Sequence, residues 1–227
     1  MPETVNDHSL DSSPATKGHE IGGTLVLLAA AGLLGVISQS VKQKDTKQFD
    51  DTIHETLQAH RSPTIDLIAR PVTLLSLPIL VVTATAGLVL WLKQQDRTEA
   101  AIAIGFAPVA AATLGQAFTT FFPQRNPPDH QDAHSGRGPE ASFPSGHTAG
   151  VTAEALAIGY VLNREKLLSP ATLAMVLGWP LVVGVIRLYR DRHWASDILA
   201  GWVAGAGVAA ASALLYDVLT SRKQTAS

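Results

Sequence analysis

The sequence contains no cysteine, which excludes disulfide bonds, thiolate nucleophiles, iron–sulfur clusters and cysteine-based zinc sites. Charge is also scarce, because charged residues make up 16% of the chain, against about 25% in typical soluble domains. The 17 basic and 19 acidic residues leave a net charge of -2, so no basic surface for nucleic acid is expected. This shortage of charge makes membrane topology the first question to ask of the chain.

Long charge-free stretches separate the few charged residues. A membrane-spanning helix needs about 20 predominantly apolar residues, whereas soluble helices average about 11–12 residues and carry a polar face. A soluble helical protein is therefore the weaker interpretation. Five stretches without Lys, Arg, Asp or Glu have a suitable length, and a sixth is interrupted only by Glu154: 21–41, 71–92, 100–124, 167–186, 198–216 and 146–162. We expect an all-α integral membrane protein with a bundle of six transmembrane helices.

The rest of the chain predicts a simple domain organisation. Residues 1–20 are polar and are expected to form a disordered tail, residues 21–216 the membrane domain, and residues 217–227 a C-terminal tail. Within residues 47–60, apolar side chains recur at every fourth position between charged ones. This spacing predicts a short amphipathic helix that lies in the plane of the membrane interface.

One loop combines residues suited to binding an anion. Pro144 and Ser145 precede the apolar stretch 146–162, and proline resists continuing a helix while serine is a good N-cap. The free N–H groups of a helix N-terminus form an anion site, and Gly146 permits close approach of a ligand. The Ser145 hydroxyl and nearby amides are suited to phosphate oxygens, and His147 to protonating a leaving oxygen. An ordinary capped helix with a surface histidine is the alternative.

A second loop carries a histidine and an aspartate whose spacing suits an activated nucleophile or base. His193 and Asp197 are four residues apart and share one face of a helix. A carboxylate bonded to one imidazole nitrogen fixes the tautomer and makes the other nitrogen a better nucleophile or base. Arg187, six residues before His193, can present two donors to a phosphate. A basic loop touching lipid headgroups would account for Arg190 and Arg192, but not for ionisable residues at the start of an apolar helix.

These two loops resemble motifs of a known family. Pro-Ser-Gly-His at 144–147 and Arg-x5-His-x3-Asp at 187–197 resemble the second and third motifs of the type 2 phosphatidic acid phosphatase superfamily, which includes lipid phosphate phosphatases and vanadium haloperoxidases. The resemblance covers roughly residues 45–216, and Ile186 stands where the third motif usually has serine. The first motif, KxxxxxxRP, is incomplete: its lysine is missing and Arg125 is the one cation near its arginine position.

The resemblance implies a metal-independent enzyme without a cofactor. It implies that His193 attacks phosphorus and forms a phosphohistidine, that Asp197 orients His193, and that His147 protonates the leaving group and then activates water. The charge on the transferring phosphoryl group would be stabilised by Arg187, Ser145, Gly146 and Arg125.

The same resemblance predicts the substrate and the location. The expected substrate is a lipid phosphomonoester or pyrophosphate, either a prenyl pyrophosphate such as undecaprenyl pyrophosphate or a glycerolipid phosphate. The expected location is a bacterial plasma membrane, with the active site on the extracytoplasmic face. Two alternatives stay open: a lipid phosphotransferase that uses the same histidine nucleophile, and a non-catalytic lipid-binding or transport protein on the same scaffold.

Three further features are less specific. Gly201 and Gly205 are four residues apart, which predicts close packing of the last helix within the bundle. Glu154 is expected either to interact with a basic active-site group or to make a polar contact between helices. His130 and His134 have a spacing that metal ligands use, but the surrounding prolines and glycine favour a solvated loop without metal.

Overall fold

The computed structural model describes residues 14–121, 125–126, 128 and 142–226. Within these residues the chain is entirely helical, which confirms the all-α class. The helices are α1 (Pro14–Gln43), α2 (Lys47–Ala59), α3 (Pro63–Leu75), α4 (Pro78–Gln94), α5 (Thr98–Phe121), α6 (Gly146–Arg164), α7 (Pro170–Tyr189) and α8 (Ala195–Ala226).

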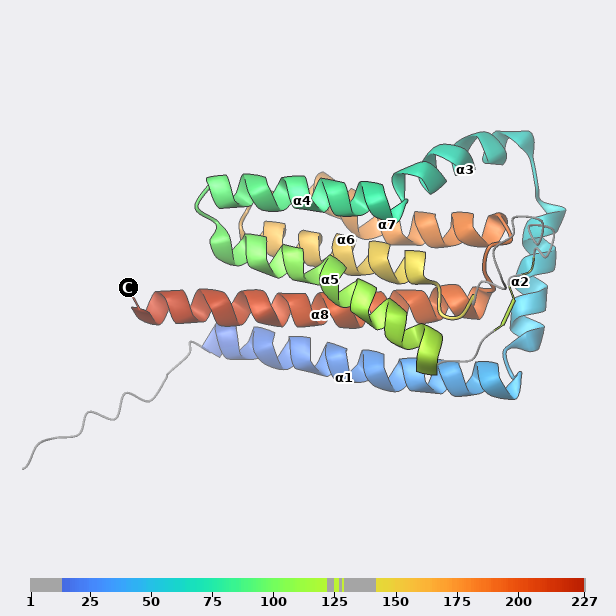
Figure 1. Cartoon of the computed structure of the whole chain (residues 1–227), viewed down its shortest axis with the longest axis horizontal. Coiled ribbons are helices and arrows are strands. Elements are labelled where there is room, and N and C mark those ends of the chain that lie inside the picture. Colours follow the sequence, from blue (N-terminus) through green and yellow to red (C-terminus); the bar gives the residue numbers. More distant parts are fainter. Residues whose placement is uncertain (1–13, 122–124, 127, 129–141, 227) are drawn as a thin grey trace, which may run out of the picture.

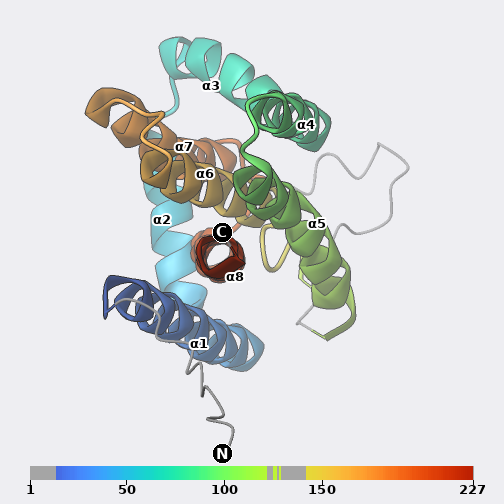
Figure 2. The ribbon, with the colours of Figure 1, turned by 90° about the vertical axis from the view of Figure 1, so that its left-hand side faces the viewer.

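Helix α6 is the centre of the bundle. It packs against α8, α5 and α7, and 11 of its 19 residues are buried. Helix α8 lies between α6 and α1, as the end-on view shows (Figure 2). Helix α2, the amphipathic helix expected from the sequence, lies across the end of the bundle where α6 and α8 begin (Figure 1). That end is where both sequence motifs are found.

Four helices are each long and apolar enough to cross a membrane, and two further helices are so only when taken together. The helices long and apolar enough to cross a membrane are α1, α5, α7 and α8, within 21–43, 98–118, 170–189 and 195–224. Helices α3 and α4 meet the same criterion together, with a bend of 53° between them. Large apolar side chains such as Leu28, Ile79 and Met175 are exposed on these helices, as a lipid-facing surface requires.

The expected count of six spans is not confirmed, because α6 is long enough but not apolar enough to be counted as a span. Polar side chains lower its hydropathy, among them Thr148, Thr152 and Glu154, and all three are buried. A helix surrounded by protein contacts little lipid, so its outer surface does not have to be apolar. Four spans, or five with the bent pair, are what the described residues support.

The chain ends differ from the boundaries expected from the sequence. Residues 1–13 lie outside the described residues, and α1 begins at Pro14, within the segment expected to be a polar tail. At the other end, α8 continues without interruption to Ala226, through most of the segment expected to be a C-terminal tail.

Small residues bring α8 against the start of α6. A Cβ atom built on Gly201 would lie 2.9 Å from both the Ser145 carbonyl oxygen and Thr148 Cβ. A Cβ atom on Gly205 would lie 2.5 Å from the Ala149 carbonyl oxygen, a distance that no side chain tolerates. The close packing predicted from the spacing of these glycines is therefore confirmed, and it occurs within the bundle.

We predict that Gly205→Ala destabilises the protein, because its methyl group would overlap the Ala149 backbone. Overpacking of this kind costs about 1–3 kcal/mol, so the thermal unfolding temperature in detergent should fall by several degrees. Gly32→Ala on α1 is the matched control, since a Cβ atom there meets nothing within 4 Å. Equal unfolding temperatures for the two variants would contradict the packing described here.

Candidate active site

The two sequence motifs meet where α6 and α8 begin. The Ser145 N–H, just before α6, donates a hydrogen bond to the Asp197 carbonyl oxygen in the first turn of α8, at 3.1 Å. This backbone contact joins the Pro-Ser-Gly-His segment directly to the Arg-x5-His-x3-Asp segment. Helix α7 ends at Tyr189, beside the same region, and supplies Arg187 from its last turn.

His193 is buried, and its two ring nitrogens have different partners. Nδ1 lies 3.0 Å from the Ser142 carbonyl oxygen and 3.6 Å from Asp197 Oδ2. A carbonyl oxygen only accepts, so Nδ1 carries the proton and Nε2 keeps a lone pair. Nε2 lies 3.0 Å from Arg187 Nη2. The nitrogen that keeps the lone pair therefore lies beside a cation and accepts a hydrogen bond from it.

Asp197 is fully buried, and both of its carboxylate oxygens are bonded. Oδ2 accepts a hydrogen bond from the Trp194 N–H at 2.9 Å. Oδ1 accepts two from Arg125, from Nε at 2.9 Å and from Nη2 at 2.6 Å. Because Trp194 follows His193 directly, the carboxylate fixes the backbone beside the imidazole as well as lying near its ring. The expected proximity of Asp197 to His193 is present, while the nearest acceptor for Nδ1 is the Ser142 carbonyl.

Arg125 occupies a different place from the one expected for a phosphate ligand. Besides the two bonds to Asp197, Nη2 donates to Ser196 Oγ at 2.6 Å and Nη1 to Asp50 Oδ2 at 2.9 Å. All three guanidinium nitrogens thus donate hydrogen bonds to protein side chains, namely those of Asp197, Ser196 and Asp50. Asp50, on α2, was not singled out from the sequence, since nothing in the pattern of α2 distinguishes it from the adjacent Asp51. The Ser142 carbonyl was missed because a backbone acceptor has no sequence signal.

Helix α2 also holds the loop that leads to His193. Asp191 adopts a φ of 55°, in the left-handed region that non-glycine residues rarely occupy. Its carboxylate accepts hydrogen bonds from Gln58, at the end of α2, and from Arg61 just beyond it. A second Arg61 contact reaches the Tyr189 carbonyl oxygen at 3.1 Å. The loop between α7 and α8 is therefore fixed from outside by the end of α2 and the residue Arg61 that follows it.

His147 is the second residue of α6 and is partly buried. It lies close enough to Arg187 and His193 to interact electrostatically with both. The structure therefore brings together the two histidines and the arginine that the sequence assigned to one phosphoryl site. Attack on phosphorus and proton transfer to its leaving oxygen require two such groups at one site.

The N-terminus of α6 is formed as the sequence predicts. Ser145 is fully buried and its Oγ accepts the Thr148 N–H at 3.3 Å, as an N-cap does. The same hydroxyl donates to Thr148 Oγ1 at 2.9 Å. Gly146 is exposed, and nothing lies within 4 Å of a Cβ atom built on it. The first turn of α6 thus presents an open backbone surface beside His147, where an anion can approach the helix N-terminus.

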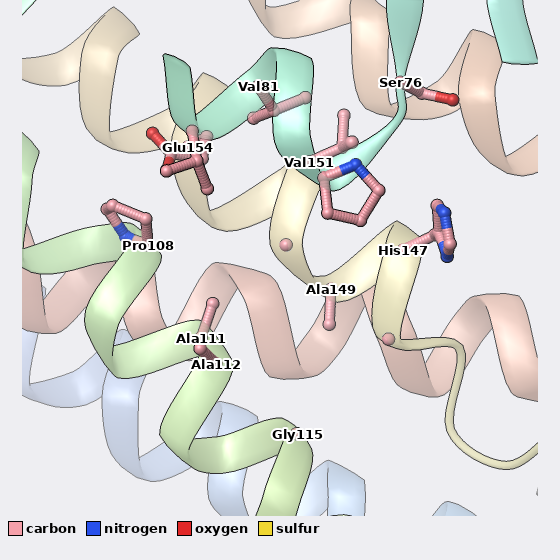
Figure 3. A pocket seen from close by; sticks show the side chains of 14 residues that line it. Ser76, Val81, Pro108, Ala111, Ala112, Gly115, His147, Ala149, Val151 and Glu154 are labelled. Carbon is pink, nitrogen blue, oxygen red and sulfur yellow. The ribbon is translucent and has the colours of Figure 1, made fainter. Parts of the chain in front are cut away.

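An apolar cavity of about 250 Å³ runs from His147 along α6 (Figure 3). Its walls come from the junction of α3 and α4, from α4, from α5 and from α6, and its lining includes Ser76, Val81, Pro108, Ala111, Gly115, Val151 and Glu154. His147 and Glu154 lie toward opposite ends of it in the close view. Glu154 bonds to Thr85 on α4 at 2.9 Å, so the polar contact between helices is the alternative that the structure realises.

The electrostatics of His193 favour its neutral form. Burial lowers the pKa of its imidazole from the ordinary value of 6.5, and the nearby Arg187 acts in the same direction. The carboxylate of Asp197 and the Ser142 carbonyl oppose this shift by favouring the protonated ring. Because burial is the largest effect, the lone pair on Nε2 is retained at neutral pH.

Comparisons with known proteins agree with this geometry. The family model described as the PAP2 superfamily matches residues 100–221, more than half of the chain. The chain belongs to the PAP2 superfamily. This PAP2 protein is also similar in fold to the crystal structure of a transmembrane PAP2-type phosphatidylglycerolphosphate phosphatase from Bacillus subtilis. The TM-score is 0.59 at 19% identity, covering 88% of this chain and 96% of that one. No curated protein sequence matches the chain.

The matched region contains every site residue inferred from the sequence, and the family resemblance is thereby confirmed. Asp50 lies outside it. Among the described residues, no group of three or more His, Asp or Glu side chains is arranged to hold a metal ion. His130 and His134 lie outside the described residues.

We predict that ¹⁵N NMR of histidine-labelled protein in detergent shows His193 as the neutral Nδ1–H tautomer down to pH values below 6.5, because burial lowers its pKa. Asp197→Asn removes a charge that raises this pKa, so the titration should move to still lower pH. The signal is assigned by its loss in His193→Gln. A protonated ring at pH 7, or a shift to higher pH in Asp197→Asn, would contradict the arrangement described for this site.

Proposed function

We propose that this PAP2 protein is a membrane lipid phosphatase that works through a phosphohistidine on His193. The observation that carries the proposal is the placement of His193: Nδ1 is held by the Ser142 carbonyl, and Nε2 is presented beside Arg187. A phosphoryl group attacked by Nε2 would meet this guanidinium on one side and the start of α6 on the other. Both stabilise the negative charge that develops in the transition state.

The proposed reaction has two steps. In the first, the lone pair of His193 Nε2 attacks phosphorus and the bond from phosphorus to the leaving oxygen breaks. His147, which is protonated beside the negative charge of the bound phosphate, gives that oxygen its proton. In the second, His147 takes a proton from water, the oxygen of water attacks phosphorus, and the phosphorus–nitrogen bond breaks to release phosphate. Both histidines return to their starting states. Proton transfers of this kind contribute about 10²–10⁴-fold to a rate.

Protein groups supply the positive charge in this mechanism, so we propose that it needs no metal ion and no other cofactor. Arg187 provides a planar pair of donors suited to phosphate oxygens, and the amides of Gly146 and His147 lie at the open N-terminus of α6. The Ser145 hydroxyl is engaged with Thr148, so its proposed contribution is to hold this turn in place and to reach phosphate only by rotation.

The apolar cavity supports an amphiphilic substrate. With the phosphate between the histidines, the hydrocarbon tail would extend from His147 along α6 between α4 and α5. Prenyl phosphates or pyrophosphates, including undecaprenyl pyrophosphate, and glycerolipid phosphates all have this shape. We further propose a bacterial plasma membrane as the location, with the site on the extracytoplasmic face, as the family resemblance implies. The motifs lie together at the bundle end that α2 crosses (Figure 1).

We predict that His193→Gln lowers phosphate release from a lipid phosphate by about 10³-fold or more, because the nucleophile is lost. The measurement is free phosphate released by purified protein in detergent, from a panel of prenyl and glycerolipid phosphates. His60→Gln, an exposed histidine after α2, is the matched control and should retain full activity.

Undiminished phosphate release by His193→Gln would exclude the mechanism, and no release from any lipid phosphate by the wild type would exclude the function. The same assay with added alcohol separates hydrolysis from transfer. A phosphotransferase would convert the alcohol to its phosphate ester instead of releasing phosphate.

A further inference from the structure

Asp50 is a buried acid that belongs to no motif and yet contacts the catalytic segment. Its carboxylate is 2% exposed and accepts three hydrogen bonds. Oδ1 accepts the Ser196 N–H at 2.8 Å, and Oδ2 accepts Ser196 Oγ at 2.8 Å and Arg125 Nη1 at 2.9 Å. Helix α2, which lies across the bundle end, thus reaches the first turn of α8, next to Asp197.

One cation is shared between two buried acids. The Arg125 guanidinium lies between Asp50 and Asp197, and the rings of Phe143 and Trp194 are 5.9 and 5.8 Å from its central carbon. A buried ion must be paired and hydrogen-bonded to be tolerated, so the position of each acid depends on the other through this arginine. The position of Asp197, in turn, fixes the Trp194 backbone beside His193.

We propose that Asp50 is a positioning residue for the phosphoryl-transfer site, acting through Arg125 and Ser196 on Asp197. This inference rests on the proposed function. It assigns Arg125 to holding the orienting acid rather than to binding phosphate. It also makes the interfacial helix α2 a part of the catalytic machinery, although α2 contributes no group that touches the substrate.

The test is Asp50→Asn, which keeps the shape and removes the charge. It should lower kcat by about 10- to 100-fold, the effect of losing a hydrogen bond between charged groups. KM should change by less than about twofold, because no substrate contact is lost. Asp51→Asn, the neighbouring acid bonded to Lys47, is the matched control and should leave both constants unchanged. Ser196→Ala, which removes one bond to each partner, should give a smaller decrease in kcat.

A wild-type kcat in both Asp50→Asn and Ser196→Ala would overturn the positioning role. An increase in KM without a change in kcat would overturn it as well. If Asp50→Asn unfolds in detergent, Ser196→Ala alone decides the outcome. Failure of the wild type to release phosphate from any lipid would instead overturn the proposed function, so the two failures are distinguishable.

A different observation concerns the far end of the cavity. Glu154 is 4% exposed, and its Oε2 accepts a hydrogen bond from Thr85. Among the described residues, Oε1 has no hydrogen-bond partner. Glu154 lines the cavity that starts at His147, seven residues earlier on α6, an axial rise of about 10 Å. A buried polar atom without a partner is costly in a membrane, so a carboxyl group here indicates a ligand that bonds to it.

We infer that Glu154 is a hydrogen-bonding subsite for the ester carbonyl groups of a glycerolipid phosphate. This inference, too, rests on the proposed function and names its substrate class. Ester carbonyls are the first polar groups below the phosphate in such a lipid, whereas a prenyl chain has none. A neutral carboxyl group, the form favoured where no counter-charge is present, donates its O–H to such a carbonyl.

The test compares phosphatidic acid with its dialkyl ether analogue, which has the same tails and phosphate but no carbonyls. The wild type should prefer the ester by about 3- to 10-fold in kcat/KM, the effect of one hydrogen bond. Glu154→Leu should lose this preference, and Glu154→Gln, which keeps a donor, should retain it. Equal rates for ester and ether in the wild type, or a preference that survives in Glu154→Leu, would overturn the subsite. Inactivity toward both lipids would overturn the proposed function instead.

Discussion

The close contact between α6 and α8 is the constraint on which the site depends. Two glycines on α8 let its backbone touch the backbone of α6, and one hydrogen bond then joins Ser145 to Asp197. The two motifs are about 40 residues apart in sequence, so tertiary packing and not chain connectivity sets their separation in space. Without a side chain at Gly201 or Gly205, the start of α6 and the first turn of α8 form one rigid unit that holds both histidines.

The buried charged side chains near this unit contact one another. The described part of the bundle has few buried ions, and those near the site are linked. Asp197 and Asp50 share Arg125, while Arg187 contacts Nε2 of His193. Both carboxylate oxygens of Asp50 and of Asp197 are bonded by protein donors, so ordering these two acids does not depend on water. The Ser142 carbonyl, in addition, sets the tautomer of His193 before a substrate arrives. Such preorganisation makes charge stabilisation effective, because the donors do not have to reorganise when charge develops.

Local features of the site could be predicted from the sequence, and long-range partners could not. The N-cap at Ser145 and the glycine spacing on α8 follow from short-range chemistry, and both are present. The contacts of Arg125 depend on a helix 75 residues earlier in the chain, which no spacing reveals. The number of spans is not settled by the apolar stretches, because a stretch such as 146–162 can be buried within protein as well as in lipid.

The break between α3 and α4 forms one wall of the cavity. The two helices meet at a bend of 53°, and residues at that junction, Ser76 and Pro78, form part of the cavity wall (Figures 1 and 3). The cavity is thus bounded by helices whose outer faces are apolar, on the side that faces hydrocarbon. The lipid substrate proposed above would enter between these helices by diffusion in two dimensions. The rate of turnover would then follow the mole fraction of that lipid in the bilayer, and diluting the membrane with inert lipid would slow turnover even when the bulk amount of substrate is constant.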